Sequence, residues 1–206
     1  MFNFSFKALL LFAFIALSPY SVQASGVMVF GDSLSAGYGL EPGQGWVDLL
    51  AQRVQEEGLA IEVVNASVSG ETTSGGLARL PDLLDLHEPQ WVVLELGAND
   101  GLRGMPLQII EANLAKLAET VQASGAQLVV VGIRLPPNYG PRYTDSFFNL
   151  FPKLAETFEA PLVPFLLEGV ADNWSLMQAD GLHPTAEAQP KILDTVWQVL
   201  AGVLKQ

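Results

Sequence analysis

The sequence predicts an α/β protein, a three-layer α/β/α sandwich around a five-stranded parallel sheet. Five short, β-rich apolar runs alternate with longer amphipathic segments along the 206-residue chain. Half of the residues are hydrophobic and only 16% are charged, which is enough apolar material for a core. Parallel strands need right-handed crossovers, so helices are expected on both faces. No repeat, low-complexity tract or linker divides residues 25–206, which are expected to form one domain.

The five predicted strands are short and rich in valine, isoleucine and leucine. They are residues 27–30, 61–66, 91–97, 126–133 and 161–165. Helices are predicted after them wherever apolar residues recur every three to four positions. They are residues 45–58, 76–87, 106–125, 141–158 and about 184–204. We expect Pro81 to interrupt the second helix, Pro152 to shorten or kink the fourth, and Pro190 to separate the first turn of the last.

Residues 1–24 are predicted to be a signal peptide. Lys7 precedes an unbroken apolar run over residues 8–17, and the small residue Ala24 marks the cleavage position. A run of that length is too short to cross about 30 Å of hydrocarbon, so no stable membrane anchor is expected. The mature protein is therefore expected in the periplasm or outside the cell.

Composition excludes several classes of function. The formal net charge is −12, which argues against nucleic acid and anionic membrane surfaces as partners. The chain has no cysteine, so disulfides, a thiol nucleophile and zinc–thiolate sites are all excluded. Asp and His residues are not grouped as metal ligands, so no metal or cofactor is expected. We expect a monomer.

Polar residues suited to acyl transfer follow four of the five predicted strands. They are Ser33 in "GDSLS", Gly70 in "NASVSG", Asn99 in "GAND", and Asp180 and His183 in "DGLHP". The carboxyl ends of parallel strands lie at one edge of a sheet, which is where ligands bind in open α/β folds. These residues are therefore expected to meet in one crevice.

Serine is a weak nucleophile without an adjacent base, and His183 is the candidate base for Ser33. The other histidine of the mature chain, His87, precedes a strand and is expected at the opposite edge. Asp180 lies three residues before His183, close enough in a tight loop to orient its ring. A turn before a helix would explain "DGLHP" equally well if it stood alone.

An oxyanion needs hydrogen-bond donors, and three are available at this edge. They are the backbone N–H groups of Ser33 and Gly70 and the side-chain amide of Asn99. Each residue has an ordinary alternative explanation, since glycine and asparagine are common in turns. Only the complete set indicates hydrolysis.

The set resembles the SGNH, or GDSL-type, hydrolase family in "GDSLS" (31–35), "NASVSG" (65–70), "GAND" (97–100) and "DGLHP" (180–184). The segment "LPPNYGPRY" (135–143) is similar to the bacterial periplasmic thioesterase I, lysophospholipase and arylesterase branch. The resemblance covers nearly the whole mature chain and implies a flavodoxin-like fold with serine esterase activity and no cofactor.

In that family the serine is the nucleophile, the aspartate and histidine complete a triad, and the glycine and asparagine complete an oxyanion hole. The resemblance therefore implies Ser33, Asp180 and His183 as catalytic residues, and it implies an oxyanion hole of Ser33, Gly70 and Asn99. The implied substrates are aryl esters, acyl thioesters and lysophospholipids.

Apolar residues near the predicted site are candidates for binding an acyl or aryl group. They are Leu102, Met105, Pro136, Pro137, Tyr139 and Tyr143. Ordinary packing explains them equally well. Glycines flank the segment 101–104, so it is also a candidate for movement over a bound chain.

Other acids near the site have structural interpretations. Asp32 and Asp100 are expected to hold loop backbone, and Glu95 is expected to be a buried, hydrogen-bonded group. A glycosidase-like carboxylate pair would leave Ser33 and His183 unexplained. The alternatives that stay open are a carbohydrate O-acetylesterase, an acyltransferase on the same triad, and a non-catalytic flavodoxin-like binding module.

Overall fold

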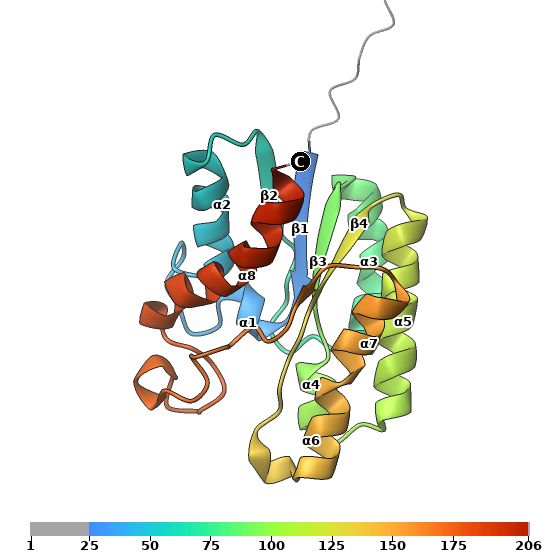
Figure 1. The fold of residues 1–206 in the computed structure, drawn as a ribbon, viewed down its shortest axis with the longest axis vertical. Coiled ribbons are helices and arrows are strands. Elements are labelled where there is room, and N and C mark those ends of the chain that lie inside the picture. The colour runs from blue at the N-terminus through green and yellow to red at the C-terminus, as the bar shows by residue number, and fades with distance from the viewer. Residues whose placement is uncertain (1–24, 206) are drawn as a thin grey trace, which may run out of the picture.

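Five parallel strands form one sheet at the centre of the computed structural model, which describes residues 25–205 (Figure 1). The strands in chain order are β1 (Ser25–Gly31), β2 (Ile61–Asn65), β3 (Trp91–Glu95), β4 (Gln127–Val131) and β5 (Leu162–Val163). Their order across the sheet is β2-β1-β3-β4-β5. The predicted sheet is therefore confirmed, while the predicted signal peptide lies outside the described residues.

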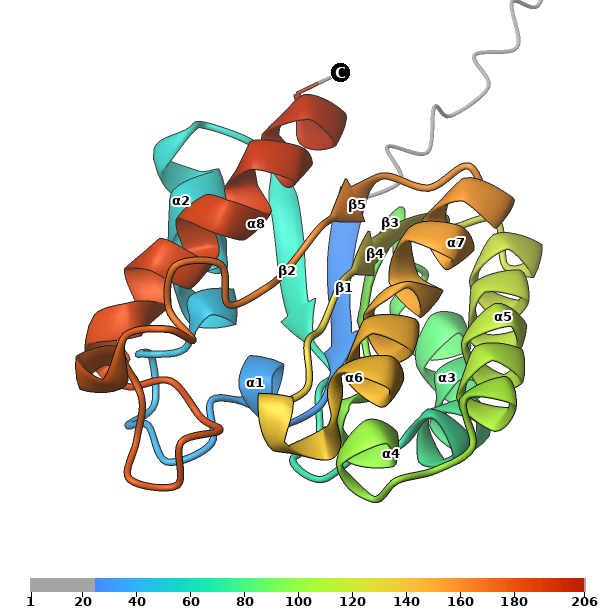
Figure 2. The ribbon, with the colours of Figure 1, turned by 60° about the horizontal axis from the view of Figure 1, so that its bottom comes forward.

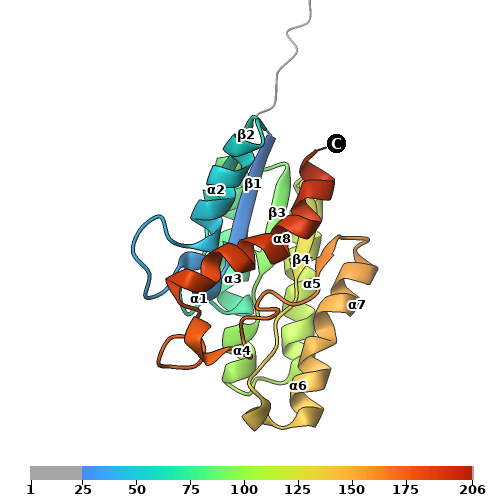
Figure 3. The ribbon, with the colours of Figure 1, turned by 60° about the vertical axis from the view of Figure 1, so that its left-hand side comes forward.

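Helices cover both faces of the sheet, which confirms the three-layer prediction. One face carries α2 (Trp46–Glu56) and α8 (Gln189–Leu204). The other carries α3 (Thr73–His87), α5 (Leu107–Ala123), α6 (Pro141–Phe148) and α7 (Leu150–Thr157). Figures 2 and 3 show α2 and α8 side by side on their face.

Side chains of β1 supply both hydrophobic cores in alternation, because successive residues of a strand point to opposite faces. Val27 and Val29 pack beneath α2 and α8, whereas Met28 and Phe30 pack beneath α3 and α5. All four are fully buried. The sheet is thus packed against helices on both faces, and the loops at its carboxyl edge start from buried strands.

The three prolines expected to interrupt or shorten helices, Pro81, Pro152 and Pro190, have different effects. The expectation that Pro81 interrupts its helix was wrong, since α3 runs through it from Thr73 to His87. Pro81 lies on the exposed side of α3, where water can solvate the carbonyl that lacks an N–H partner. The predicted fourth helix is divided into α6 and α7 at Asn149, with Pro152 in the first turn of α7.

Pro190 confirms the third expectation about prolines. It lies in the first turn of α8, where its missing N–H leaves no helical hydrogen bond unmade. A separate short helix, η3 (Ala186–Ala188), precedes that turn.

Short helices occupy the carboxyl edge of the sheet. They are α1 (Ser33–Ala36) after β1, α4 (Ala98–Leu102) after β3, η1 (Pro137–Tyr139) after β4 and η2 (Trp174–Leu176) after β5. In Figure 1, α1 and α4 lie toward the bottom, below the strand ends. Among residues 25–205, no helix is both long and apolar enough to cross a lipid bilayer.

Candidate active site

Ser33 stands where β1 ends and a single helical turn begins. Asp32 is the N-cap of α1, and Ser33 is the first residue of that helix. The Asp32 carboxylate accepts a hydrogen bond from the Leu34 N–H at 3.1 Å, which satisfies one of the free donors at the helix start. The Ser33 side chain is left half-buried at the carboxyl edge of the sheet.

The structure brings together the three residues predicted to form a triad. His183 Nε2 lies 2.9 Å from Ser33 Oγ, although 150 residues separate them. His183 Nδ1 lies 2.6 Å from Asp180 Oδ2. The hydroxyl, imidazole and carboxylate therefore form a continuous hydrogen-bonded line, which is the geometry needed to activate a serine.

Asp180 is held as a charged carboxylate. Burial by itself raises the pKa of Asp180, but hydrogen bonds outweigh it and lower the pKa to about 2. The donors are the His183 N–H at 3.0 Å, the Leu182 N–H at 2.9 Å and the His183 ring. A charged Asp180 stabilises a proton on His183.

Two residues that the sequence analysis missed support the histidine. The His183 carbonyl accepts from the Gln178 N–H at 2.7 Å, and Gln178 Nε2 donates to the carbonyls of Tyr38 and Pro184, each at 2.9 Å. The Tyr38 ring packs on the imidazole with centroids 4.4 Å apart. No spacing rule links Tyr38 to Gln178, which lies 140 residues away.

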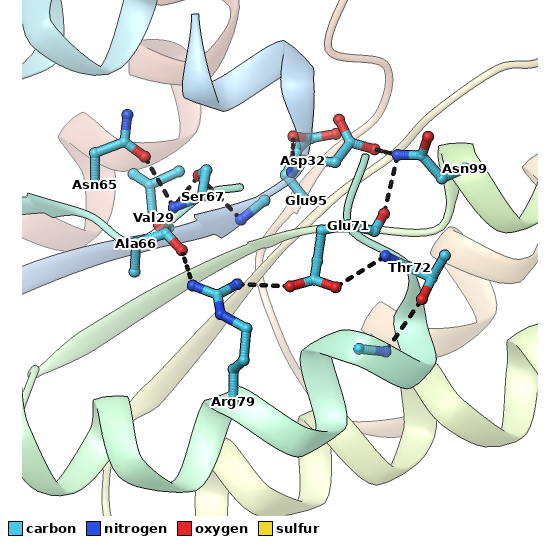
Figure 4. Close-up of polar contacts among 12 residues, drawn as sticks. Val29, Asp32, Asn65, Ala66, Ser67, Glu71, Thr72, Arg79, Glu95 and Asn99 are labelled. Carbon is cyan, nitrogen blue, oxygen red and sulfur yellow. Dashed lines mark hydrogen bonds and ion pairs between the residues drawn. The ribbon is translucent and has the colours of Figure 1, made fainter. Parts of the chain in front are cut away.

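The candidate oxyanion donors lie on neighbouring segments. Gly70 has a φ of 81°, in a turn closed by a 3.1 Å hydrogen bond from the Glu71 N–H to the Val68 carbonyl. A Cβ at Gly70 would meet nothing within 4 Å, so the need for glycine is conformational rather than steric. Asn99, in α4, donates from Nδ2 to the Glu71 carbonyl at 2.9 Å and to Asp32 Oδ2 at 3.2 Å (Figure 4).

A buried pair of carboxyl groups lies behind this donor. Glu95 Oε2 accepts from Ser35 Oγ at 2.7 Å and from the Asp32 N–H at 3.3 Å, as expected for a structural role. A Cβ at Gly31 would come within 2.6 Å of Glu95 Oε2, which explains the glycine.

Both buried carboxyl groups have a raised pKa. Burial raises the pKa of Asp32 to about 6. Burial, and then the negative charge of Asp32, raise the pKa of Glu95 well above its usual range.

Asp100 fastens α4 to α3. Its carboxylate accepts from the Thr73 N–H at 2.9 Å and from Thr73 Oγ1 at 2.6 Å. Both residues are fully buried. Asp100 therefore holds backbone, as expected, and it fixes the segment that carries Asn99.

The predicted substrate-binding residues lie together after β3 and β4. Tyr139 donates from its hydroxyl to the Leu102 carbonyl at 2.8 Å, and Tyr143 donates to the Met105 carbonyl at 2.7 Å. Leu102, Met105 and Tyr143 are partly buried against the core. Pro137 and Tyr139 are exposed and Pro136 is half-buried. An acyl-binding role for these residues stays a prediction.

His87 is the last residue of α3 and is exposed just before β3 begins, at the edge opposite Ser33.

Within residues 25–205, no three His, Asp or Glu side chains are arranged to hold a metal ion.

Residues 29–189 match the model of the GDSL-like lipase/acylhydrolase family. The chain belongs to this family. Esterase TesA of Pseudomonas aeruginosa is 49% identical over 200 residues, which are 96% of this chain and 100% of that protein. Thioesterase 1/protease 1/lysophospholipase L1 of Escherichia coli is 45% identical over 94% of this chain and 92% of its own length.

The fold has a close counterpart among solved structures. The psychrotrophic esterase EstA from Pseudoalteromonas sp. superposes with a TM-score of 0.84 at 42% identity. The match covers 88% of this chain and 100% of that chain. The family predicted from the four sequence segments is thus confirmed.

Proposed function

We propose that this protein is a serine hydrolase that cleaves carboxylic esters and thioesters through an acyl-enzyme. The observation that carries the proposal is the hydrogen-bonded line from Ser33 Oγ through His183 to Asp180. Membership of the acylhydrolase family and the names of the esterase and thioesterase relatives support the same chemistry.

In the first half-reaction, His183 Nε2 takes the proton of Ser33 Oγ as this oxygen attacks the substrate carbonyl. The charged Asp180 stabilises the imidazolium that forms. His183 then gives the proton to the leaving alcohol or thiol, and the acyl group stays on Ser33. In the second half-reaction, His183 activates water, which releases the acid and restores the hydroxyl.

The negative oxygen of each tetrahedral intermediate is held by the N–H groups of Ser33 and Gly70 and by the amide of Asn99. Asn99 Nδ2 already donates to the Glu71 carbonyl and to Asp32 Oδ2. The bond to Asp32 is the longer of the two, at 3.2 Å. The substrate oxygen therefore shares or replaces that bond as it becomes charged.

Replacement of the nucleophile tests the proposal. Ser33→Ala is expected to lower kcat on p-nitrophenyl esters, acyl-CoA and lysophospholipid by about 10⁴-fold or more while leaving the thermal transition unchanged. Full activity in the variant would contradict the proposal.

A covalent probe gives a second readout. The related EstA was solved inhibited by monoethylphosphonate. A fluorophosphonate is therefore expected to label wild type here, but not Ser33→Ala. A flavin or nucleotide that copurifies with an unlabelled protein would instead favour a binding module.

The proposed substrates carry an apolar acyl or aryl group. Leu102, Met105 and Tyr143 are partly buried, Pro137 and Tyr139 are exposed, and the Tyr139 hydroxyl bonds to the Leu102 carbonyl. Rates are expected to vary along a series of p-nitrophenyl esters of increasing chain length. Identical rates along the series would contradict an apolar groove.

We also propose that the enzyme acts outside the cytoplasm, as a monomer, after removal of residues 1–24. Cleavage after Ala24 would leave β1 complete, because its first residue, Ser25, already pairs with Ile61. Mass spectrometry of the exported protein is expected to give an N-terminus at or near Ser25. An exported form that retains the leader would contradict cleavage, and a dimer in sedimentation would contradict the monomer.

A further inference from the structure

Arg79 contacts both ends of the segment that carries Gly70. This segment, residues 66–72, joins β2 to α3. Arg79 Nη2 donates to the Ala66 carbonyl at 2.8 Å, and Nη1 lies 2.7 Å from Glu71 Oε2 (Figure 4). One guanidinium therefore joins the start of the segment to its far end, five residues later.

Glu71 connects this ion pair to two of the three candidate oxyanion donors, Gly70 and Asn99. Its carbonyl accepts from Asn99 Nδ2 at 2.9 Å, and its N–H closes the turn that contains Gly70. Its second carboxylate oxygen accepts from the Thr72 N–H at 3.1 Å. Glu71 is thus held at its side chain by Arg79, while its backbone positions Gly70 and Asn99.

The surroundings of Arg79 restrict its movement. The guanidinium lies over the Phe30 ring at 5.4 Å from the centroid. A Cβ at Gly76 would lie within 2.7 Å of Leu96, so a glycine lets α3 approach the sheet closely. A Cβ at Gly75 would collide with the Glu71 carboxylate, so a second glycine leaves room for the ion pair.

We propose that Arg79 is a positioning residue for oxyanion stabilisation, which holds residues 66–72 so that the Gly70 N–H and the Asn99 amide point at the reacting carbonyl oxygen. The inference rests on the proposed function. Arg79 does not touch the substrate and acts only through Glu71 and Ala66.

The chemistry of the side chain explains why arginine stands here. The guanidinium is a rigid planar fork, so it holds two acceptors at a fixed angle. A lysine at position 79 would keep the charge and the pair with Glu71 but would reach only one acceptor at a time.

Steady-state kinetics of Arg79→Ala, Arg79→Lys and Glu71→Gln test the proposal on p-nitrophenyl esters. An oxyanion hole binds the transition state more tightly than the substrate, so kcat should fall while KM stays nearly constant. We expect a loss in kcat of about 10- to 100-fold for Arg79→Ala and a smaller loss for Arg79→Lys.

Chemical rescue separates positioning from general stability. Millimolar guanidinium chloride is expected to restore part of the kcat of Arg79→Ala, whereas the same concentration of sodium chloride is not. Fluorophosphonate titration of active sites counts the folded fraction, so kcat refers to correctly folded enzyme in every variant.

Arg53, in α2, offers a matched control. The side chains of Arg53 and Arg79 are equally exposed at 32%, and each pairs with a carboxylate. Arg53 also lies over an aromatic ring, that of Trp197 at 5.7 Å. Arg53→Ala is expected to keep kcat within about two-fold of wild type because α2 does not carry an oxyanion donor.

An unchanged kcat per active site in Arg79→Ala and Glu71→Gln would overturn the proposal. An equal loss of kcat in Arg53→Ala would also overturn it. So would a loss of activity that guanidinium does not restore and that is proportional to the loss of folded enzyme. If Arg79→Ala does not fold, Arg79→Lys and Glu71→Gln decide. A proposal that fails here leaves the inactivity of Ser33→Ala intact, whereas an active Ser33→Ala would overturn the proposed function itself.

Discussion

Asp180 and Asp32 are the same residue type within one candidate site, yet their environments shift their pKa values in opposite directions. The Asp180 side chain is exposed. Partial desolvation raises its pKa, but hydrogen bonds from two backbone N–H groups and the His183 ring together lower the pKa to about 2. Asp32 is buried, and burial raises its pKa to about 6.

The hydrogen bonds show which acid can serve the histidine, because Asp180 Oδ2 lies 2.6 Å from His183 Nδ1. Hydrogen bonds to a carboxylate stabilise its charge, whereas burial without enough donors favours the proton. Asp180 therefore stays charged and can stabilise an imidazolium. Asp32, with Glu95 behind it, instead holds the Leu34 backbone and the Asn99 amide.

The largest expected effect tests Asp180. Asp180→Asn removes the charge and favours the wrong ring tautomer of His183, so kcat should fall by about 10⁴-fold. Asp32→Asn keeps a polar group of the same size and should cost far less. Kinetics on p-nitrophenyl acetate measure both, and equal losses in the two variants would break the distinction.

A smaller effect is expected at the donor that Asp32 holds. Asn99→Ala removes one oxyanion donor, and kcat should fall by about 10²- to 10³-fold with little change in KM. The same assay measures it, with a thermal melt as the control for folding. A variant that loses affinity and keeps kcat would assign Asn99 to substrate binding instead.

The pH dependence of stability should have opposite signs for the two acids. The pKa of Asp32 rises from 3.8 to about 6 on folding, so its folded form binds the extra proton and stability falls as pH rises from about 4 to 6. The pKa of Asp180 falls from 3.8 to about 2, so its contribution is complete above about 4 and is lost as pH falls toward 2.

Urea unfolding between pH 2 and 7 measures these slopes as differences from Asp32→Asn and Asp180→Asn. The free-energy difference for Asp32→Asn should change as pH rises above about 4, and that for Asp180→Asn as pH falls below about 4. Slopes of the same sign would contradict the assigned environments.

The smallest effect is expected for the histidine at the other edge of the sheet. His87→Asn should keep kcat within about two-fold because His87 is exposed at the end of α3, far from Ser33. Its matched partner, His183→Asn, should lose nearly all activity. A large loss in His87→Asn would mean that the candidate site is incomplete.

Much of the site was predictable because a parallel sheet brings the carboxyl ends of its strands to one edge. Ser33, Gly70, Asn99 and the Asp180–His183 pair each follow a strand, so their order was enough to place them together.

Contacts that depend on tertiary packing were not predictable. Arg79 contacts Ala66 and Glu71 because α3 packs back over the end of β2. The spacing of apolar residues predicts the helix but does not predict these contacts. Gln178 meets Tyr38 across the fold for the same reason. The expectation for Pro81 was wrong because a proline on the exposed side of a well-packed helix need not break it.

Trapping of the acyl-enzyme tests the central claim most directly. Wild-type protein mixed with p-nitrophenyl acetate, quenched in acid within the first turnover and digested, is predicted to carry one acetyl group on the peptide that contains Ser33. Asp180→Asn should form the adduct far more slowly, and Ser33→Ala should form none. Turnover with no covalent adduct, or an acetyl group on another residue, would contradict the account.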